Sequence, residues 1–302
     1  MLSDSSRAGM VRRHPLMSFF FMAYLVSWLC WTPYVLSRDG LDVLHFAVPR
    51  MFGDSQLIGI LPGGYLGPLT SAFLVTALAE GREGLRRWRR RLFRWRVPLR
   101  WYLFALLGVP ALLMVGTSAV PGAWGGRHVL PPAGVFAAYL PLLVLQTLTT
   151  GVAEEPGWRD FALPRLQHRL GPLRGTLTLA ALWALWHAPL FLTTWSGHHT
   201  DPGVLLGYLA TAVSISVVIT WVFNRTGGSL PLAVLVHVGN NNVLSTVWPA
   251  AFPDLDPFRD GLVASAAGFG ALAVVLVIAT RGRLGLPRPR EGARPSRAPQ
   301  LI

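Results

Sequence analysis

The stretch VFAAYLPLLVLQTLTTGVAEEPGWRD, residues 135–160, decides the fold class of this chain. Residues 135–153 contain no Asp, Glu, Lys, Arg or His, and a helix needs about 20 mostly apolar residues to cross a bilayer. Glu154, Glu155 and Arg159 follow directly. The stretch therefore predicts a transmembrane helix that carries ionisable groups.

Further apolar stretches of similar length occur along the whole chain. They cover residues 16–36, 56–79, 101–120, 175–195, 203–223, 229–250 and 261–280. Of the 302 residues, 52% are hydrophobic and 14% are charged, whereas about a quarter of a soluble domain is charged. We therefore expect an all-α, polytopic membrane protein of about eight transmembrane helices that enclose a polar intramembrane cavity.

The distribution of arginine predicts the topology. All 27 basic residues are arginine, and the formal net charge is +13. With the N-terminus in the cytoplasm, 23 of the 27 arginines, Arg159 among them, fall in cytoplasmic segments, as the positive-inside rule requires. We therefore expect both termini in the cytoplasm.

Residues 82–100 combine nine arginines with Trp88 and Trp95. Such a basic segment could bind RNA, but an amphipathic segment lying on anionic lipid headgroups explains it without a second partner. We therefore expect the lipid bilayer as a partner, and no nucleic acid.

Ionisable groups occur within three of the predicted helices, where each costs about 2.5–3.5 kcal/mol on insertion. At the usual helical rise, Glu154, His187 and His237 lie about 14, 18 and 12 Å from the cytoplasmic ends of their helices. Polar groups on three separate helices are therefore expected at a similar depth, which favours a shared site over scattered substitutions.

Spacing within the helices supports such a site. Glu155 precedes Arg159 by four residues, the favourable order for an ion pair along a helix. For this pair taken alone, a structural ion pair at a helix end is the favoured interpretation. His237 and Asn241 are also four residues apart and can point into the same cavity. Pro156 is expected to bend or interrupt the helix beside the glutamates.

Several arrangements that cleave peptides in a membrane are missing from the sequence. No His is followed by Glu, so the HExxH zinc motif is absent, and no GxSxG motif occurs. No Asp lies within a predicted span. Glutamate and histidine are the reactive groups that remain.

The polar segments resemble three motifs of the CPBP family of membrane proteins, which includes the CAAX proteases and the bacteriocin-processing (Abi) proteins. Residues 154–159, 183–187 and 237–241 are similar to its EExxxR, FxxxH and HxxxN motifs, in this order and on separate predicted helices. Trp183 stands where the second motif usually has Phe, and Asp160 stands where Gly is frequent. The resemblance covers about the central third of the chain.

The resemblance implies an intramembrane endopeptidase that hydrolyses a peptide bond in a peptide or membrane-protein substrate. It implies that Glu154 is the general base and that His187 is its partner in holding the attacking water. His237 and Asn241 would face the scissile carbonyl. Glu155 with Arg159 is expected to hold the helix and to tune Glu154.

Members of this family are also labelled metalloproteases. One carboxylate and two imidazoles, from Glu154, His187 and His237, could hold Zn²⁺ with an open position for water. Metal-free chemistry and a zinc site therefore both remain open, and no other cofactor is expected.

The resemblance also divides the chain into three regions. Residues 1–134 are expected to form three transmembrane helices with a basic cytoplasmic loop at 81–100. Residues 135–250 are expected to form a four-helix catalytic core, and residues 251–302 the last transmembrane helix and a basic, disordered cytoplasmic tail.

Other functions fit parts of the sequence. A non-catalytic membrane scaffold or bacteriocin-immunity protein would retain the helices without the chemistry, and a transporter could use Glu154 and the histidines as a proton relay. No internal repeat of the kind common in transporters is visible. A chain without lysine and rich in Gly, Ala and Leu is typical of a high-GC bacterium, so we expect the bacterial cytoplasmic membrane. The substrate and the oligomeric state stay open.

Overall fold

The computed structural model describes residues 4–51 and 55–287, which form helices and contain no strand. The first part contains α1 (Asp4–Arg13), α2 (Pro15–Leu36), α3 (Gln56–Gly64), η1 (Tyr65–Leu69), α4 (Thr70–Leu92), α5 (Leu99–Leu103), η2 (Phe104–Gly108) and α6 (Val109–Thr117). The middle part contains α7 (Ala133–Gln146), η3 (Thr147–Gly151), α8 (Val152–Glu155), η4 (Pro156–Ala162), α9 (Leu163–Leu170), α10 (Pro172–Trp186), η5 (Ala188–Leu192) and η6 (Thr194–Ser196). The last part contains α11 (Pro202–Arg225), α12 (Leu230–Asn242), η7 (Val243–Val247), α13 (Trp248–Ala251) and α14 (Arg259–Ala279).

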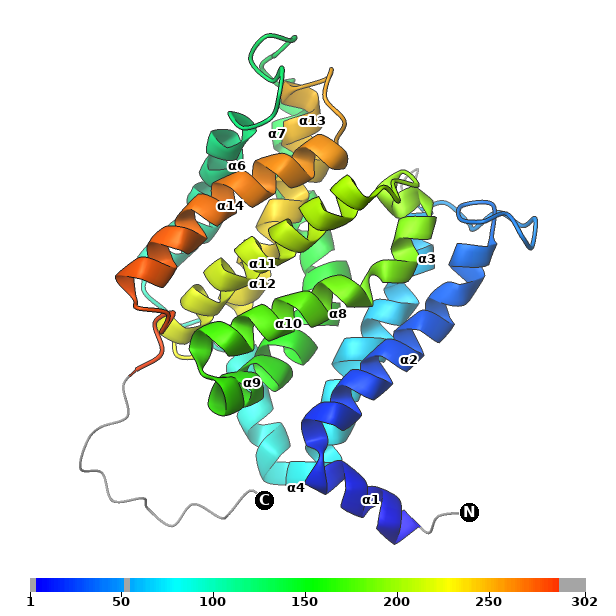
Figure 1. The fold of residues 1–302 in the computed structure, drawn as a ribbon, viewed down its shortest axis with the longest axis vertical. Helices are drawn as coiled ribbons and strands as arrows, with labels where there is room; N and C mark the ends of the chain where they lie inside the picture. The colour runs from blue at the N-terminus through cyan, green and yellow to red at the C-terminus, as the bar shows by residue number, and fades with distance from the viewer. Residues whose placement is uncertain (1–3, 52–54, 288–302) are drawn as a thin grey trace.

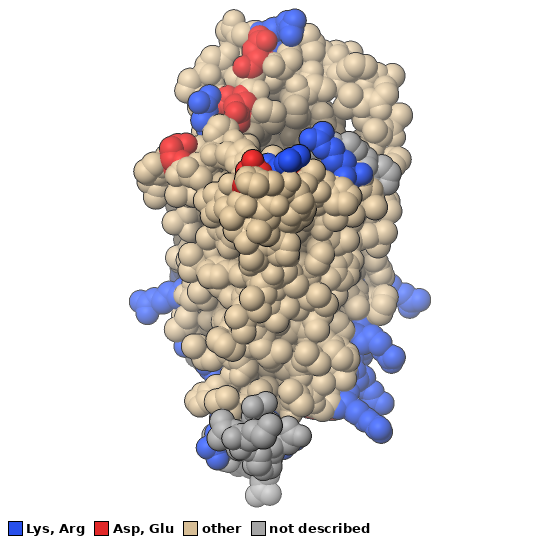
Figure 2. All heavy atoms as spheres, turned by 90° about the vertical axis from the view of Figure 1, so that its right-hand side faces the viewer, with Lys and Arg blue, Asp and Glu red and all other residues tan. Residues whose placement is uncertain are grey.

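Seven helical segments of the described chain are long and apolar enough to cross a membrane. They are Pro15–Leu36, Gln56–Leu92, Leu99–Thr117, Ala133–Leu170, Pro172–Leu192, Pro202–Arg225 and Arg259–Ala279. Each covers one of the predicted apolar stretches, so the expected polytopic, all-α membrane fold is confirmed. On the face drawn in Figure 2, acidic residues occur only toward the upper end, where arginines lie beside them. Further arginines extend from the lower half, and a band of uncharged residues separates the two charged regions.

The helices pack side by side at similar tilts. Figure 1 shows α2, α10, α11 and α14 inclined in the same direction, with α11 packed between α10 and α14, and α6 packed against α14. Glycine permits the closest approaches: a Cβ at Gly67 would lie 1.9 Å from Ser27 Oγ, and one at Gly116 would lie 1.9 Å from the Ala264 carbonyl oxygen. These contacts bring the backbones of α2 and η1, and of α6 and α14, together.

The eighth predicted stretch, residues 229–250, is helical as α12, η7 and α13, but it is not among the segments apolar enough to span a membrane. Its polar residues include His237 and Asn240–Asn242. Helix α12 packs against α11, α7, α6 and η3, and most of its residues are buried. Because protein rather than lipid surrounds α12, its polar side chains can be satisfied by neighbouring helices.

The fourth span differs from the prediction in its length. The apolar stretch was expected to end at residue 153, and the depth of Glu154 was estimated for a helix that persists to the residue before Pro164, whereas the helical segment continues to Leu170. Arg159, which was counted among the cytoplasmic arginines, lies inside η4 and is fully buried in the protein. Proline at 156 removes a backbone donor, and the chain passes through the π-helical segments η3 and η4 instead of stopping.

A basic cytoplasmic loop was expected at residues 81–100, but the first part of this segment is helical. Helix α4 continues to Leu92 beyond a kink at Gly81, whose φ of 63° is readily adopted by glycine. Arginine and leucine favour helix formation, which explains why residues 82–92 stay helical. Residues 288–302, which make up most of the tail predicted to be disordered, lie outside the described residues.

Candidate active site

Glu154 comes from the short helix α8, which lies between the π-helical segments η3 and η4. Its side chain is buried, and its Oε2 accepts a hydrogen bond from the indole Nε1 of Trp183, at 2.8 Å. Trp183 lies on α10, one helical turn before His187. The hydrogen bond from Trp183 fixes Oε2 of Glu154 and leaves Oε1 for another partner. The π-helical segments on both sides of α8 are breaks in regular α-helical geometry, which are frequent at functional sites.

His187 lies at the C-terminal end of α10, where the α-helix gives way to the 3-10 helix η5 before Pro189. Its Nδ1 lies 2.8 Å from the carbonyl oxygen of Trp183, so Nδ1 carries the proton and donates it. Nε2 is then the acceptor nitrogen. The ring stacks on Trp195 with centroids 5.6 Å apart and meets Tyr208 edge-on at 5.4 Å, which holds its orientation.

His237 from α12 is held by Glu155. Its Nδ1 lies 2.9 Å from Glu155 Oε1, a hydrogen bond between residues 82 positions apart in the chain. A carboxylate that binds one ring nitrogen fixes the orientation of the imidazole and frees the other nitrogen, as in many catalytic and metal sites. Glu155 therefore positions His237, a role that the sequence did not predict.

The Glu155–Arg159 pair is part of the same buried network. Arg159 Nε lies 3.2 Å from Glu155 Oε2, and both side chains are 0% exposed. Arg159 Nη2 donates to Ser216 Oγ at 3.2 Å, and its guanidinium lies 4.9 Å from the ring centre of Trp183. The pair is therefore buried inside the protein, and whether it tunes Glu154 or only holds the helix stays a prediction.

Trp183 is the common contact of the candidate residues. Besides its bond to Glu154, its ring lies 5.5 Å from the ring of His187 and 5.1 Å from that of His237. Glu154, His187 and His237 are 7%, 6% and 3% exposed, so the groups lie together in the protein interior. The structure thus brings together side chains from three helices.

Asn241 is not joined to this network within the part of the chain that the structure describes. It is half-buried, lies one turn beyond His237 and accepts a hydrogen bond from Asn240 Nδ2 at 3.2 Å. Its neighbours bridge helices: Ser265 of α14 donates to Asn240, and Asn242 donates to the Tyr139 carbonyl of α7. The expected role of Asn241 stays a prediction.

The zinc set considered from the sequence is not assembled by the side chains as they lie. Among residues 4–51 and 55–287, no three His, Cys, Asp or Glu side chains are grouped so that they could hold a metal ion. The indole of Trp183 contacts all three proposed ligands, Glu154, His187 and His237. Whether the site binds zinc stays a prediction.

Some residues of the site were missed in the sequence. Tyr208 and Ser216 belong to α11, a helix that the sequence shows only as an apolar span. Their contacts with His187 and Arg159 join residues at least 21 positions apart, for which a single sequence gives no signal. Trp183 was noted only as an aromatic replacement, although its N–H is a donor that phenylalanine lacks.

Comparison with known proteins finds similarity to CAAX-type proteases. Residues 136–243 match a family model described as "Type II CAAX prenyl endopeptidase Rce1-like". The protein named CAAX prenyl protease 2 from Methanococcus maripaludis is 21% identical over 227 residues, which cover 72% of this chain and 80% of that protein. The matched family segment begins in α7, ends at the start of η7, and contains every candidate residue named above.

Proposed function

Since the chain belongs to the CPBP family of CAAX-type membrane proteases, we propose that it is an intramembrane endopeptidase in which Glu154 and His187 activate a water molecule. One observation carries the proposal: Glu154, His187 and the Glu155-held His237 come from three helices and meet around Trp183 in the protein interior. Burying ionisable groups is energetically unfavourable, so three of them at one place in the interior indicate a shared function.

In the proposed first step, Glu154 Oε1 takes a proton from a water molecule. His187 Nε2 accepts a hydrogen bond from the other O–H group of the same water and so holds it in place. The water oxygen attacks the peptide carbonyl carbon, and negative charge develops on the carbonyl oxygen. Glu154 then returns the proton to the amide nitrogen as the C–N bond breaks, which releases a carboxylic acid and an amine; the acid then gives its proton to the amine, so the products leave as a carboxylate and an ammonium group. General acid–base transfer of this kind contributes about 10²–10⁴-fold in rate.

His237 and Asn241 are proposed to face the carbonyl oxygen. With Nδ1 donating to Glu155, the Nε2 atom of His237 is the nitrogen left for the substrate. The neighbouring carboxylate favours an imidazolium, whose Nε2–H could donate to the developing oxyanion. The amide of Asn241 is the second proposed donor, and each preorganised donor is worth about 10²–10³ in rate.

The substrate is proposed to be a membrane-associated peptide or protein, with CAAX-type processing suggested by the named relative. The proposed location is the bacterial cytoplasmic membrane with both termini inside. Membranes of a strain lacking the gene would be compared after expression of wild type and Glu154→Ala. If the protein is a protease, membranes from cells that express wild type should contain a peptide fragment that is missing with Glu154→Ala. Equal fragment patterns at equal protein levels would favour the scaffold or immunity protein.

We propose that the reaction needs no metal, because the described carboxylate and imidazole groups do not converge as a ligand set. A zinc chelator, added to purified protein in lipid nanodiscs, is expected to leave the cleavage rate unchanged. The measurement is the initial rate on the identified peptide with and without 1,10-phenanthroline. Loss of activity that added Zn²⁺ restores would establish a zinc enzyme instead.

Trp183 is proposed to position Glu154 through its N–H. Trp183→Phe keeps the ring but removes the donor, so kcat is expected to fall about tenfold, as for one lost hydrogen bond, with KM unchanged. Trp158→Phe is the matched control, because Trp158 is fully buried, its Nε1 has no hydrogen-bond partner in the described structure, and its ring packs on Phe19 and Trp186. Equal kcat values for the two variants would remove this role from Trp183.

A further inference from the structure

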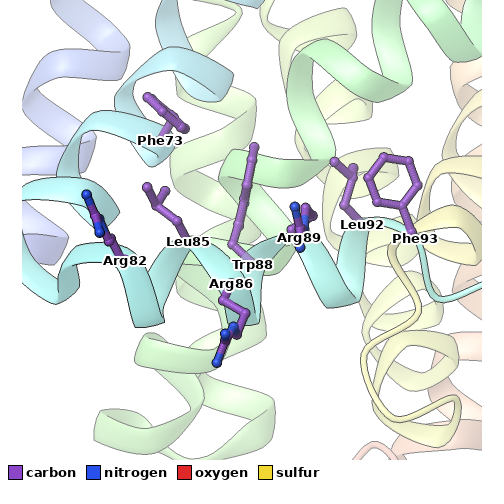
Figure 3. A pocket seen from close by; sticks show the side chains of 8 residues that line it. All are labelled: Phe73, Arg82, Leu85, Arg86, Trp88, Arg89, Leu92 and Phe93. Atoms are coloured by element: carbon purple, nitrogen blue, oxygen red, sulfur yellow. The ribbon is translucent and has the colours of Figure 1, made fainter.

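A groove outside the candidate active site lies along the second half of α4, beyond the kink at Gly81. It has a volume of about 460 Å³. Its apolar wall includes Phe73, Leu85, Trp88 and Leu92, and the rings of Phe73 and Trp88 lie 6.2 Å apart. Figure 3 shows Phe73 on the segment before the kink, with Leu85, Trp88 and Leu92 pointing toward the same side from the segment beyond it.

Arginines border this apolar surface. Figure 3 shows Arg82 pointing to the same side of the helix as Trp88 and Arg86 pointing to the opposite side. Arg89, next to Trp88 in the chain, also lines the groove. Arg86 and Arg90 each lie 3.6 Å from Glu83. Arg82 and Arg89 are exposed and form no ion pair with an acidic side chain of the described residues. Two positive charges beside the groove are therefore available for an anion.

The opposite side of this helix is anchored to the protein. Arg91 pairs with the buried Asp160 of η4, and Arg87 pairs with Glu80 at 2.8 Å. Glu80 also pairs with Arg165 of α9. These ion pairs hold the helix beyond the kink against the helices that carry the candidate site, so the groove is formed without a ligand.

The groove lies at the junction between an apolar helical segment and a segment rich in arginine. The segment Gln56–Leu92 is apolar enough to span a membrane, and the arginines begin directly after its kink. Figure 1 shows the end of α4 at the lower end of the molecule, next to α1. Phe73, on the apolar side of the kink, is 44% exposed on the outer surface. An amphipathic helix in this position has its apolar side toward the acyl chains and its arginines at the headgroups.

We propose that this groove binds one anionic phospholipid. Arg82 and Arg89 bind the headgroup phosphate, and an acyl chain lies along Leu85, Trp88 and Phe73. The chemistry of the groove favours such a lipid. Guanidinium groups pair well with phosphate, and the aromatic and aliphatic side chains that line the groove suit an acyl chain. The site is separate from the candidate active site, and its test needs no peptidase activity.

The test uses purified protein in nanodiscs of phosphatidylcholine that contain a small fraction of brominated phosphatidylglycerol. Bromine quenches nearby tryptophan, and the contribution of Trp88 is obtained by subtracting the signal of Trp88→Phe. Quenching of Trp88 is expected at low fractions of brominated phosphatidylglycerol and not at equal fractions of brominated phosphatidylcholine.

Arg82→Gln/Arg89→Gln is expected to weaken the apparent affinity about 30-fold, because each basic residue at a charged membrane surface contributes about fivefold and the two factors multiply. Arg13→Gln/Arg90→Gln is the control, since it removes the same charge from exposed positions that do not line the groove. Arg82→Lys/Arg89→Lys keeps the charge and should retain most of the binding.

Three results would overturn the proposal. The first is equal quenching of Trp88 by brominated phosphatidylglycerol and brominated phosphatidylcholine. The second is an equal loss of lipid affinity in Arg82→Gln/Arg89→Gln and in the control Arg13→Gln/Arg90→Gln, which would indicate only a general attraction between the basic surface and anionic lipid. The third is displacement of the brominated lipid by a short RNA at the same ionic strength, which would assign the groove to nucleic acid. Soluble glycerol phosphate is expected not to compete, because it lacks the acyl chain.

Discussion

Glu154→Gln is expected to lower the rate of peptide cleavage by about 10²–10⁴-fold, the usual contribution of a general base. Glutamine has the same shape, and its carbonyl oxygen can still accept the Trp183 N–H bond, so the fold should persist. The measurement is kcat/KM of purified protein in nanodiscs on the peptide identified from membranes. Thermal unfolding of the same samples shows whether the variant is folded.

The matched control for this substitution is Glu83→Gln, which removes a carboxylate from an exposed side chain on α4. Its kcat/KM is expected to equal that of wild type. If Glu154→Gln retained a similar rate while folded, Glu154 would not be the base.

Glu155→Gln is expected to lower the free energy of unfolding by about 3–5 kcal/mol, because it leaves the buried Arg159 charge without its partner. It also weakens the hydrogen bond that orients His237, so activity should fall as well. Stability is measured by denaturant or thermal unfolding in a fixed detergent. The exposed Glu83→Gln variant should change stability by less than about 1 kcal/mol.

A double variant separates the two roles of Glu155. Replacing both members of a buried ion pair is often nearly neutral for stability, so Glu155→Gln/Arg159→Met should recover much of the loss. Its activity should stay low, because His237 still lacks a carboxylate partner. Equal stability of Glu155→Gln and Glu83→Gln would contradict the buried pair, and full activity in the double variant would contradict the positioning of His237.

The fold class follows from the sequence because apolar length is a strong and local signal. Seven of the predicted stretches match helical segments that can span a membrane. The failures were at positions where local rules compete. Pro156 predicts an end or bend in the helix, yet tertiary packing continues the span to Leu170 through π-helical turns. Residues 82–92 were expected as an amphipathic segment within a cytoplasmic loop, and the structure shows that they continue helix α4 beyond the kink at Gly81.

The candidate residues of the site were also visible in the sequence, because burying ionisable groups in apolar helices is costly. Their partners were not. Spacing predicted Glu155 with Arg159, but the bond from Glu155 to His237 spans 82 positions, and no local pattern encodes it. The central place of Trp183 depends in the same way on how α8, α10 and α12 pack.

The central claim is that Glu154 and His187 act on the same water molecule, and a double-mutant cycle tests it most directly. The rates of Glu154→Gln, His187→Ala and the double variant would be measured on one peptide with folded protein. When two residues act as a unit, the effects of replacing them are strongly non-additive. The rate of the double variant is therefore predicted to lie within about threefold of the rate of the slower single variant. Effects that multiply would show that the two residues act independently and would contradict the mechanism.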